Sequence, residues 1–358
     1  MEVLPMCARI AVAMSGGVDS SAAAWLLKEE GHDLLGVTLE LFCRPEGPSA
    51  DVEDARSVAR QLGIPHQVFD MAPCFRREVM DRFAAAYEAG RTPNPCVDCN
   101  CHIKFGALLD RCRELGQEAV ATGHYARLDY DVGSGRWLLK RALHPEKDQS
   151  YVLCSLTQDQ LSRSRFPLGS LSKEEIRAIA AEANLVSAHK SDSQDICFVP
   201  DGDYAAFIRR HTGKDYPAGP FLDAEGRVLG QHEGIIGYTV GQRRGLGVSS
   251  TQGRLYVKEV RPADNTVVLS DNAGLFSTTL TADGLNLIAC DKLDGPVRLT
   301  AKARYRMVPQ PCTAWQTGPD TLRVVFDQPQ RAITPGQAVV LYDGDTVVAG
   351  ATILKGES

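Results

Sequence analysis

Apolar positions in the first 205 residues fall into two patterns that alternate along the chain. Short apolar runs, typical of buried strands, lie at residues 8–14, 34–41, 66–71 and 119–125. Segments with apolar residues every three or four positions, typical of amphipathic helices, lie at residues 21–31, 51–63, 73–89, 104–115 and 172–184. This order predicts an α/β domain whose parallel sheet has right-handed crossovers.

After about residue 205 the pattern changes to short β-rich runs separated by turns such as "PADN" and "YDGD". These runs lie at residues 254–260, 265–270, 297–307, 322–327 and 337–354. They predict an all-β second half of two small barrels or sandwiches. We therefore expect three domains: residues 1–205, a small central β-rich domain at 206–273 and a C-terminal β-barrel at 274–358.

Composition is that of an ordinary folded protein, with 44% hydrophobic and 23% charged residues in a chain of 358. No apolar run approaches the roughly 18 residues that span a bilayer, and the N-terminus lacks a signal-peptide pattern, so we expect a cytoplasmic protein without membrane contact. The net charge of −6 argues against wholesale coating of nucleic acid, although residues 206–358 are slightly basic. Eleven irregularly spaced cysteines do not predict a disulfide framework.

The stretch "MSGGVDSS" (Met14–Ser21) lies between the first predicted strand and helix. Its glycines leave backbone N–H groups to face an anion, its serines add hydroxyl donors, and the helix dipole favours phosphate there. Asp19 suits a Mg²⁺ contact or a hydrogen bond within the loop. The stretch lacks the Gly-Lys-Ser/Thr of a Walker A loop and resembles the PP-loop of ATP pyrophosphatases, which cleave ATP between the α and β phosphates.

Three cysteines gather in "NPCVDCNC", and Cys197 follows in a distant polar loop, "SDSQDICFVP". A single C-x-x-C is only half of a zinc site, and no second pair follows at zinc-finger spacing. Cys99 and Cys101 precede the helix expected at 104–115, where a helix N-terminus favours the thiolate. A metal site, a disulfide and chemistry on a substrate all remain open from these residues alone.

Motifs along nearly the whole chain resemble the bacterial tRNA-specific 2-thiouridylases, enzymes that place sulfur on the wobble uridine of certain tRNAs. The matching stretches are "SGGVDSS", "TPNPCVDCN" followed by "IKFG", "TGHYAR", "KDQSYVL", "DSQDICF", "GYTVGQRRGLG", "KARYR" and "PGQAVVLYDG". The resemblance implies an N-terminal domain like the adenine nucleotide α hydrolases, a small central domain and a C-terminal β-barrel. It also implies a tRNA-uridine 2-sulfurtransferase.

The resemblance further implies roles for individual residues. Cys99 matches the nucleophile and Cys197 the cysteine that carries a persulfide, and the two would form a transient disulfide. ATP would be contacted by Ala13, Met14, Ser15, Gly16, Gly17, Val18, Asp19, Ser20, Leu39 and Gly123. The target base would lie against Asn94, Pro95 and Cys96. The residues expected to face tRNA are His124, Lys147, Asp148, Gln149, Arg304, Tyr305 and Gln337.

The implied reaction uses ATP, with Mg²⁺, to adenylate the C2 oxygen of the uridine, because an adenylated oxygen leaves as AMP. Sulfur from a persulfide on Cys197 then replaces it, and a separate persulfide-bearing protein supplies that sulfur. In one alternative, Cys99 instead releases hydrosulfide as the attacking species. The uridine has to leave the stack of the anticodon loop, which is cheap in a single-stranded loop.

Position 96 departs from the family pattern, because many members carry aspartate where this chain has cysteine. Cys96, Cys99 and Cys197 together resemble the three-cysteine sites that hold a four-iron cluster in related tRNA thiolases, with one iron open to hydrosulfide. Two other functions also fit parts of the chain. One is another PP-loop tRNA thiolase such as a 4-thiouridine synthase, and the other is a nucleotide-sensing RNA-binding module with structural cysteines.

Overall fold

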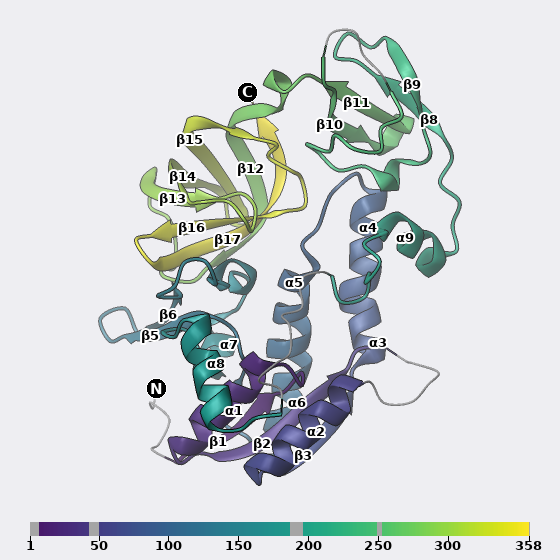
Figure 1. Ribbon diagram of the computed structural model, residues 1–358. Helices are drawn as coiled ribbons and strands as arrows, with labels where there is room; N and C mark the ends of the chain where they lie inside the picture. Colours follow the sequence, from purple (N-terminus) through teal and green to yellow (C-terminus); the bar gives the residue numbers. More distant parts are fainter. Residues whose placement is uncertain (1–6, 43–49, 187–195, 249–252, 358) are drawn as a thin grey trace.

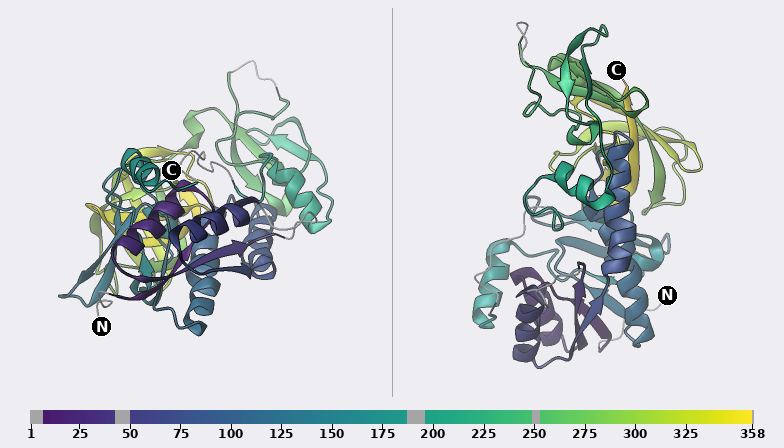
Figure 2. Two further views of the ribbon diagram at one scale, coloured as in Figure 1. Left: turned by 60° about the horizontal axis from the view of Figure 1, so that its bottom comes forward. Right: turned by 90° about the vertical axis from the view of Figure 1, so that its right-hand side faces the viewer.

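The computed structural model describes residues 7–42, 50–186, 196–248 and 253–357, and these residues form three β-sheets (Figure 1). One sheet lies at one end of the molecule and two β-rich parts lie at the other, with two long helices running between them (Figures 1 and 2). Within the described ranges, no helix is long and apolar enough to cross a membrane.

The N-terminal sheet is parallel throughout, with the strand order β3-β2-β1-β4-β7. Its strands are β1 (Arg9–Ala13), β2 (Asp33–Glu40), β3 (His66–Asp70), β4 (Ala119–Ala121) and β7 (Ser164–Arg165). Ile10 and Val12 share a buried cluster with residues of α1 (Val18–Glu29), α2 (Ala50–Leu62) and α8 (Lys173–Glu182). Ala11 packs on the opposite face, so helices cover both faces and the predicted α/β class is confirmed.

Two long helices each contain a π-helical segment. The first consists of α3 (Ala72–Phe75), η1 (Arg76–Asp81) and α4 (Arg82–Glu88), as expected for residues 73–89. The second consists of α5 (Pro95–Asp98), η2 (Cys99–Ala107) and α6 (Leu108–Glu114). The second helix was expected to begin near Lys104, and that boundary is wrong. Asn94 Oδ1 accepts the Cys96 N–H at 3.1 Å, and Pro95 fits the first turn, so the helix begins there.

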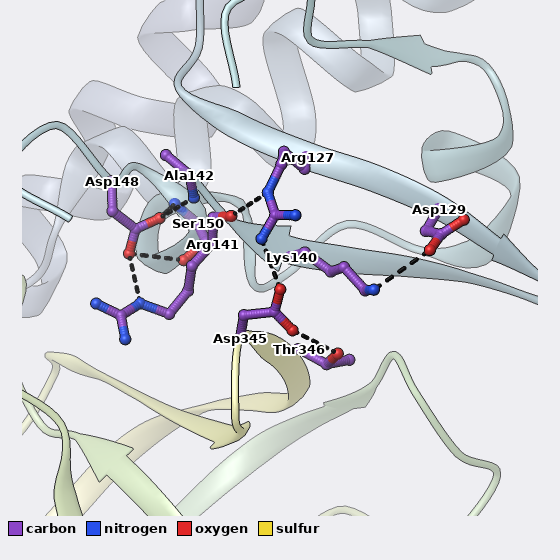
Figure 3. A network of polar contacts seen from close by, with 9 residues as sticks. All are labelled: Arg127, Asp129, Lys140, Arg141, Ala142, Asp148, Ser150, Asp345 and Thr346. Atoms are coloured by element: carbon purple, nitrogen blue, oxygen red, sulfur yellow. Dashed lines mark hydrogen bonds and ion pairs between the residues drawn. The ribbon is translucent and has the colours of Figure 1, made fainter. Parts of the chain in front are cut away.

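A hairpin of β5 (Ala126–Asp131) and β6 (Arg136–Arg141) follows β4 and was not predicted. It leaves the parallel sheet and joins the C-terminal sheet, where Lys140 pairs with Thr346. Arg127 Nη2 donates to Asp345 Oδ2 at 2.6 Å across the same junction (Figure 3). Part of residues 1–205 therefore packs as an extension of the C-terminal sheet.

The central region begins with an amphipathic helix, α9 (Tyr204–Thr212), where the sequence predicted only β-structure. A four-stranded sheet follows in the order β10-β11-β8-β9, built from β8 (Gly219–Leu222), β9 (Val228–His232), β10 (Tyr256–Arg261) and β11 (Thr266–Ser270). Phe83 and Tyr87 of α4 share its apolar cluster. Short helices elsewhere are η3 (Ser150–Leu153), α7 (Gln158–Ser162), η4 (Ile235–Gly237), η5 (Pro262–Asp264) and η6 (Ala273–Leu275).

The C-terminal region forms a six-stranded antiparallel barrel, as predicted. Its strands are β12 (Phe276–Leu287), β13 (Val297–Lys302), β14 (Gln310–Gly318), β15 (Thr321–Arg331), β16 (Ala338–Asp343) and β17 (Thr346–Glu357). The barrel closes because β12 pairs with β15 along one edge and with β17 along the other. Inward side chains such as Leu280, Val324 and Ile353 fill it. The domain boundaries at 205/206 and 273/274 stay predictions.

Candidate active site

The loop after β1 holds a backbone conformation that requires glycine. Gly16 has φ +70°, and a Cβ there would lie 2.7 Å from the Asp51 carbonyl oxygen. The Ser15 N–H donates to Ser20 Oγ at 3.1 Å. The sequence predicted that the N–H groups of this loop face an anion, but the Ser15 N–H is used inside the loop. Gly17 is the N-cap of α1 and has no side chain to cap the helix. The loop thus presents the N-terminus of a buried helix at the carboxyl edge of the sheet.

Asp19 in the first turn of α1 is held by two residues from distant segments. The Tyr125 hydroxyl and the Lys173 ammonium each lie 2.7 Å from Asp19 Oδ1 and donate to it. Lys173 is buried at the start of α8. This arrangement places a buried cation beside the phosphate-type loop, a feature that the sequence analysis missed. No pattern in the sequence marks Lys173, because its neighbours indicate only a capped helix.

Gly123 and Leu39 lie at the same sheet edge as the loop. Leu39 is near the end of β2, Gly123 follows β4, and both strands flank β1. A Cβ on Gly123 would lie 2.8 Å from the Asp19 carbonyl carbon and 2.9 Å from the Ser20 nitrogen. Only glycine lets this turn approach the first turn of α1. The carboxyl edge of a parallel sheet is where α/β proteins bind their ligands.

The cysteines of "NPCVDCNC" lie inside the first turns of the second long helix, and not before it. Cys96 is exposed, and Cys99 and Cys101 are partly buried. Cys96 and Cys99 are three residues apart and share one face of the helix. Cys101 Sγ donates to the Ser155 carbonyl oxygen at 3.7 Å, which ties it to the protein interior. Cys101 is therefore a structural thiol in this arrangement.

Asp98 points away from Cys96, because two residues correspond to about 200° around a helix. Arg82 Nε lies 3.6 Å from Asp98 Oδ1. Asp98 also lines a cavity of about 210 Å³ between α4, the second long helix and the barrel. Burial raises the pKa of Asp98. Asp98 therefore does not supply the carboxylate that the family pattern has at position 96.

Cys197 comes from a separate loop, and its neighbour Phe198 packs against the same apolar cluster as Val97 and Cys99. Although the residue is exposed, desolvation by the surrounding protein raises the pKa of the Cys197 thiol to about 12, and the charges of Cys99 and Cys96 contribute to the rise. Burial also raises the pKa of Cys99, although the Lys104 ammonium opposes this. The predicted thiolate-favouring setting at Cys99 is therefore wrong for the protein alone, because desolvation outweighs the helix N-terminus. Residues 191–195 before Cys197 lie outside the described residues.

Lys104 is a cation whose charge acts on Cys96, Cys99 and Cys197. No role was assigned to it from the sequence. Its charge lowers the pKa of Cys96, Cys99 and Cys197, against the larger effect of burial. Lys104 and Cys99 both belong to the π-helical segment η2. Residues five apart are one turn apart in a π-helix, so the segment brings Lys104 to the side of Cys99.

His124 is 8% exposed and packs against the rings of Phe105 and Phe166. Its Nδ1 lies 2.7 Å from Thr122 Oγ1. Burial, together with the charge of Lys104, lowers the pKa of His124 well below its usual range. The side chain is thus a neutral, enclosed imidazole, and its expected contact with tRNA stays a prediction.

Asp148 and Gln149 serve contacts inside the protein. Asp148 is 5% exposed and accepts hydrogen bonds from the Ala142 and Ser150 N–H groups, the Ser150 hydroxyl and Arg141 Nε (Figure 3). Gln149 Oε1 accepts the Tyr125 N–H at 3.0 Å. The expectation that the Asp148 carboxylate faces tRNA is therefore corrected, because its oxygens bind this network. Lys147 beside it is partly buried.

Arg304 and Tyr305 are exposed on the loop between β13 and β14, as an RNA contact would require. Desolvation raises the pKa of the Tyr305 hydroxyl, and the charges of Asp148 and Cys96 raise it further. Gln337 instead uses its side chain internally, since Nε2 donates to the Thr92 carbonyl at 2.7 Å. This bond fixes the barrel against the segment that precedes Asn94.

Comparisons with known proteins match nearly the whole chain. Family models match residues 8–201 ("tRNA methyl transferase HUP domain"), 205–271 ("tRNA methyl transferase PRC-barrel domain") and 277–353 ("Aminomethyltransferase beta-barrel domain"). The tRNA-specific 2-thiouridylase MnmA of Clostridioides difficile (strain 630) is 46% identical, over 97% of this chain and 98% of the relative. This chain belongs to the tRNA-specific 2-thiouridylase family.

A second curated relative and a solved structure are also similar to this chain. The 2-thiouridylase MnmA of Symbiobacterium thermophilum is 46% identical over 98% of this chain and 93% of that protein. A solved structure of a 4-thiouridine synthetase in complex with RNA and bound ATP has a TM-score of 0.35 and 17% identity. That alignment covers 57% of this chain and 50% of the other.

Because this chain has cysteine at position 96, three cysteines are candidate ligands for a metal cluster. Whether they suit a cluster depends on how their side chains are placed. Among the described residues, no three Cys, His, Asp or Glu side chains are arranged to hold a metal ion. The charges of Cys99 and Cys96 raise the pKa of Cys197, but the three thiols are not among such groups. A four-iron cluster on these cysteines stays a hypothesis.

Proposed function

We propose that this protein is a tRNA-uridine 2-sulfurtransferase that places sulfur on C2 of a wobble uridine in the anticodon loop. The observation that best supports the proposal is that the charge of Cys99, from the second long helix, acts on Cys197, from a loop almost a hundred residues later. Cys99 and Phe198, the neighbour of Cys197, also pack against the same apolar cluster as Leu39 at the end of β2. We also propose residues 1–205 as the catalytic part, with 206–273 and 274–358 as β-rich parts that bind RNA.

ATP is bound in this proposal by Ala13–Ser20 at the carboxyl edge of the parallel sheet, with Leu39 and Gly123 beside it. The phosphates lie at the N-terminus of α1, where the helix dipole and the Lys173 cation favour negative charge. Asp19 would contact a Mg²⁺ ion that screens the phosphates. The uridine O2 attacks the α-phosphorus, pyrophosphate leaves, and O2 becomes part of a good leaving group.

Sulfur arrives on Cys197, whose exposure suits transfer from a persulfide-bearing donor protein. The terminal sulfur of the Cys197 persulfide attacks C2, and AMP departs with O2. The Cys99 thiolate then attacks the Cys197 sulfur, which breaks the S–S bond to the base, leaves sulfur on C2 and forms a Cys99–Cys197 disulfide. A dithiol reductant restores both thiols. In the alternative order, the Cys99 thiolate first attacks the inner sulfur of the Cys197 persulfide. This step forms the Cys99–Cys197 disulfide and releases hydrosulfide, which then attacks C2 while AMP departs.

The raised pKa values mean that both thiols are protonated in the free protein at neutral pH. Lys104 is the group that favours thiolate in this site, and we assign it the task of stabilising negative charge on sulfur. A persulfide is a stronger acid than the parent thiol. Once Cys197 carries the extra sulfur, its terminal sulfur therefore loses a proton more readily and becomes the anion that attacks C2. This design protects the resting thiols from oxidation.

Binding of tRNA is assigned to exposed basic residues of the two β-rich parts. Arg304 and Arg306 flank Tyr305 on the barrel loop, and Arg243 and Arg244 are exposed in the central region. Arginines at such positions bind phosphates, whereas Tyr305 offers a ring for an unstacked base. Asn94, Pro95 and Cys96, at the start of the second long helix, would contact the target uridine.

The test is nucleoside mass spectrometry of anticodon stem-loop RNA incubated with the protein, ATP, Mg²⁺ and a persulfide donor. Wild type and Cys101→Ser should yield 2-thiouridine at the wobble position, whereas Cys99→Ser and Cys197→Ser should yield none while still binding ATP and RNA. Sulfur at another position of full-length tRNA would favour a 4-thiouridine synthase, and RNA binding without thiolation would favour a binding module. Iron and labile sulfide that track activity in anaerobic protein would support the cluster.

A further inference from the structure

Lys302, the last residue of β13, is a buried lysine enclosed by aromatic rings. It is 6% exposed, and its Nζ lies 5.6 Å from the ring centroid of Tyr151 and 5.6 Å from that of Tyr305. The two rings are themselves 5.8 Å apart with their planes at 58°. An ammonium between two ring faces at this distance is attracted by both, more strongly where water is excluded.

No ion pair explains this lysine. Within the described part of the chain Lys302 has no carboxylate partner, because Asp148 ion-pairs with Arg141 at 3.4 Å and takes its other hydrogen bonds from Ala142 and Ser150. Burial lowers the pKa of Lys302, and Asp148 only partly offsets this. A buried charge without a counter-ion is unfavourable, so the ring contacts are the interactions that retain it.

The two tyrosines differ in exposure and hydrogen bonding. Tyr151 is fully buried, and its hydroxyl donates to the Ala338 carbonyl at 2.7 Å, so its ring is fixed. Tyr305 is 37% exposed on the loop after β13, and the charge of Cys96 acts on its hydroxyl. Lys302 is the shared contact through which the fixed ring restrains the exposed one.

We propose that Lys302 is a positioning residue that holds the Tyr305 ring beside Cys96 as a stacking platform for the target uridine. The proposal rests on the proposed function, since an unstacked wobble base needs a new surface once it leaves the anticodon loop. Tyr305 touches the base, whereas Lys302 acts only through Tyr305. A lysine or arginine cation can make cation–π contacts with both rings, whereas a neutral side chain of the same length cannot.

The experiment uses anticodon stem-loop RNA with 5-fluorouridine at the wobble position and follows its ¹⁹F resonance on binding to the intact protein. Wild type and Lys302→Arg should give the same upfield shift from ring stacking. Lys302→Met and Tyr305→Ala should each lose at least half of that shift and weaken RNA binding by about tenfold, near the lower end of one stacking contact. The Lys302→Met/Tyr305→Ala double variant should be no weaker than Tyr305→Ala alone.

Thermal melting and ATP affinity check that each variant is folded, and Lys302→Gln replaces Lys302→Met if the latter melts below the assay temperature. The proposal is overturned if Lys302→Met keeps the wild-type shift while Tyr305→Ala loses it, or if the two losses add in the double variant. Failure of the proposed function looks different: the wild-type shift would be present without formation of 2-thiouridine.

Discussion

The Lys173 ammonium lies 2.7 Å from Asp19 Oδ1, which links the start of α8 to the first turn of α1. The pair stands where the phosphates of ATP would bind. Replacing Lys173 by Met removes the cation and leaves the Asp19 charge facing the phosphates. We expect the Kd for ATP, measured by calorimetry, to rise about tenfold, equivalent to about 1.4 kcal/mol.

A surface ion pair serves as the control for this variant. Lys355 Nζ lies 2.6 Å from Glu357 Oε1 on the barrel, with the lysine side chain 64% exposed. Exposed pairs contribute little, so Lys355→Met should leave both ATP affinity and the melting temperature nearly unchanged. An unaltered Kd for ATP in Lys173→Met would refute the role given to Lys173.

Gly123→Ala should disrupt the nucleotide site by steric overlap. The new Cβ would lie 2.8 Å from the Asp19 carbonyl carbon and 2.9 Å from the Ser20 nitrogen, and backbone atoms of a helix cannot turn aside as a side chain does. We expect ATP affinity to fall at least tenfold, as α1 shifts away from β4. Gly237→Ala is the matched control, because a Cβ there meets nothing within 4 Å. Equal affinities for the two variants would contradict the packing argument.

Lys104→Met should slow the chemistry of the neighbouring thiols. A cation favours the thiolate, so its removal raises the pKa of Cys99 and Cys197 further and lowers the thiolate fraction at any pH below that pKa. Alkylation of Cys197 by iodoacetamide at pH 8, followed by peptide mass spectrometry, should be several-fold slower than in wild type. Lys104→Arg should alkylate at the wild-type rate, and Cys290, on the barrel side, provides an internal reference. Faster alkylation in Lys104→Met would exclude an electrostatic role.

Buried thiols should make the fold sensitive to alkaline pH. Burial raises the pKa of Cys112, Cys154 and Cys312 to about 12 each, whereas an unfolded thiol titrates near about 8.5. The folded state therefore binds more protons than the unfolded state between these values. Their contribution to stability is fully present below about pH 8.5 and is lost as pH rises toward 12, by up to about 1.4 kcal/mol per pH unit and thiol.

Urea unfolding at pH 8 and pH 10 measures this effect. The free energy of unfolding should fall between the two pH values in wild type, and the fall should be smaller when Cys154 is replaced by Ala. Other alkaline titrations are common to both proteins and cancel in the comparison. The same slope in both proteins would show that the Cys154 thiol ionises as readily in the folded state as in the unfolded one.

Much of the architecture follows from local patterns. The strand at residues 8–14 and the glycines after it predicted both the parallel sheet and its phosphate-type loop, because period and turn chemistry are local properties. The early helix start at Pro95 is also encoded locally, since asparagine followed by proline is a good helix N-terminus. The hairpin at 126–141 was likewise signalled by "YDVGSGRW" between two alternating runs.

The cations of the site could not be predicted in the same way. Lys104 and Lys302 belong to the matching stretches "IKFG" and "KARYR", but the sequence assigns them no role, and Lys173 belongs to no such stretch. Their positions beside thiols, two rings and a carboxylate arise only from tertiary packing. Burial of Asp148 likewise depends on a hairpin and a barrel strand that meet it from elsewhere in the chain (Figure 3). Desolvation reversed the expected acidity of Cys99 for the same reason.

Cys99 and Cys197 are the pair that we propose to transfer sulfur. A single-turnover reaction with Cys197 persulfide, ATP and anticodon stem-loop RNA, without reductant, tests this proposal most directly by peptide mapping beside nucleoside mass spectrometry. The persulfide route predicts one Cys99–Cys197 disulfide for each 2-thiouridine formed, and the same disulfide whether Cys96 is present or replaced by Ser. Formation of 2-thiouridine by protein in which Cys197 is Ser, or a product without the disulfide, would contradict the account.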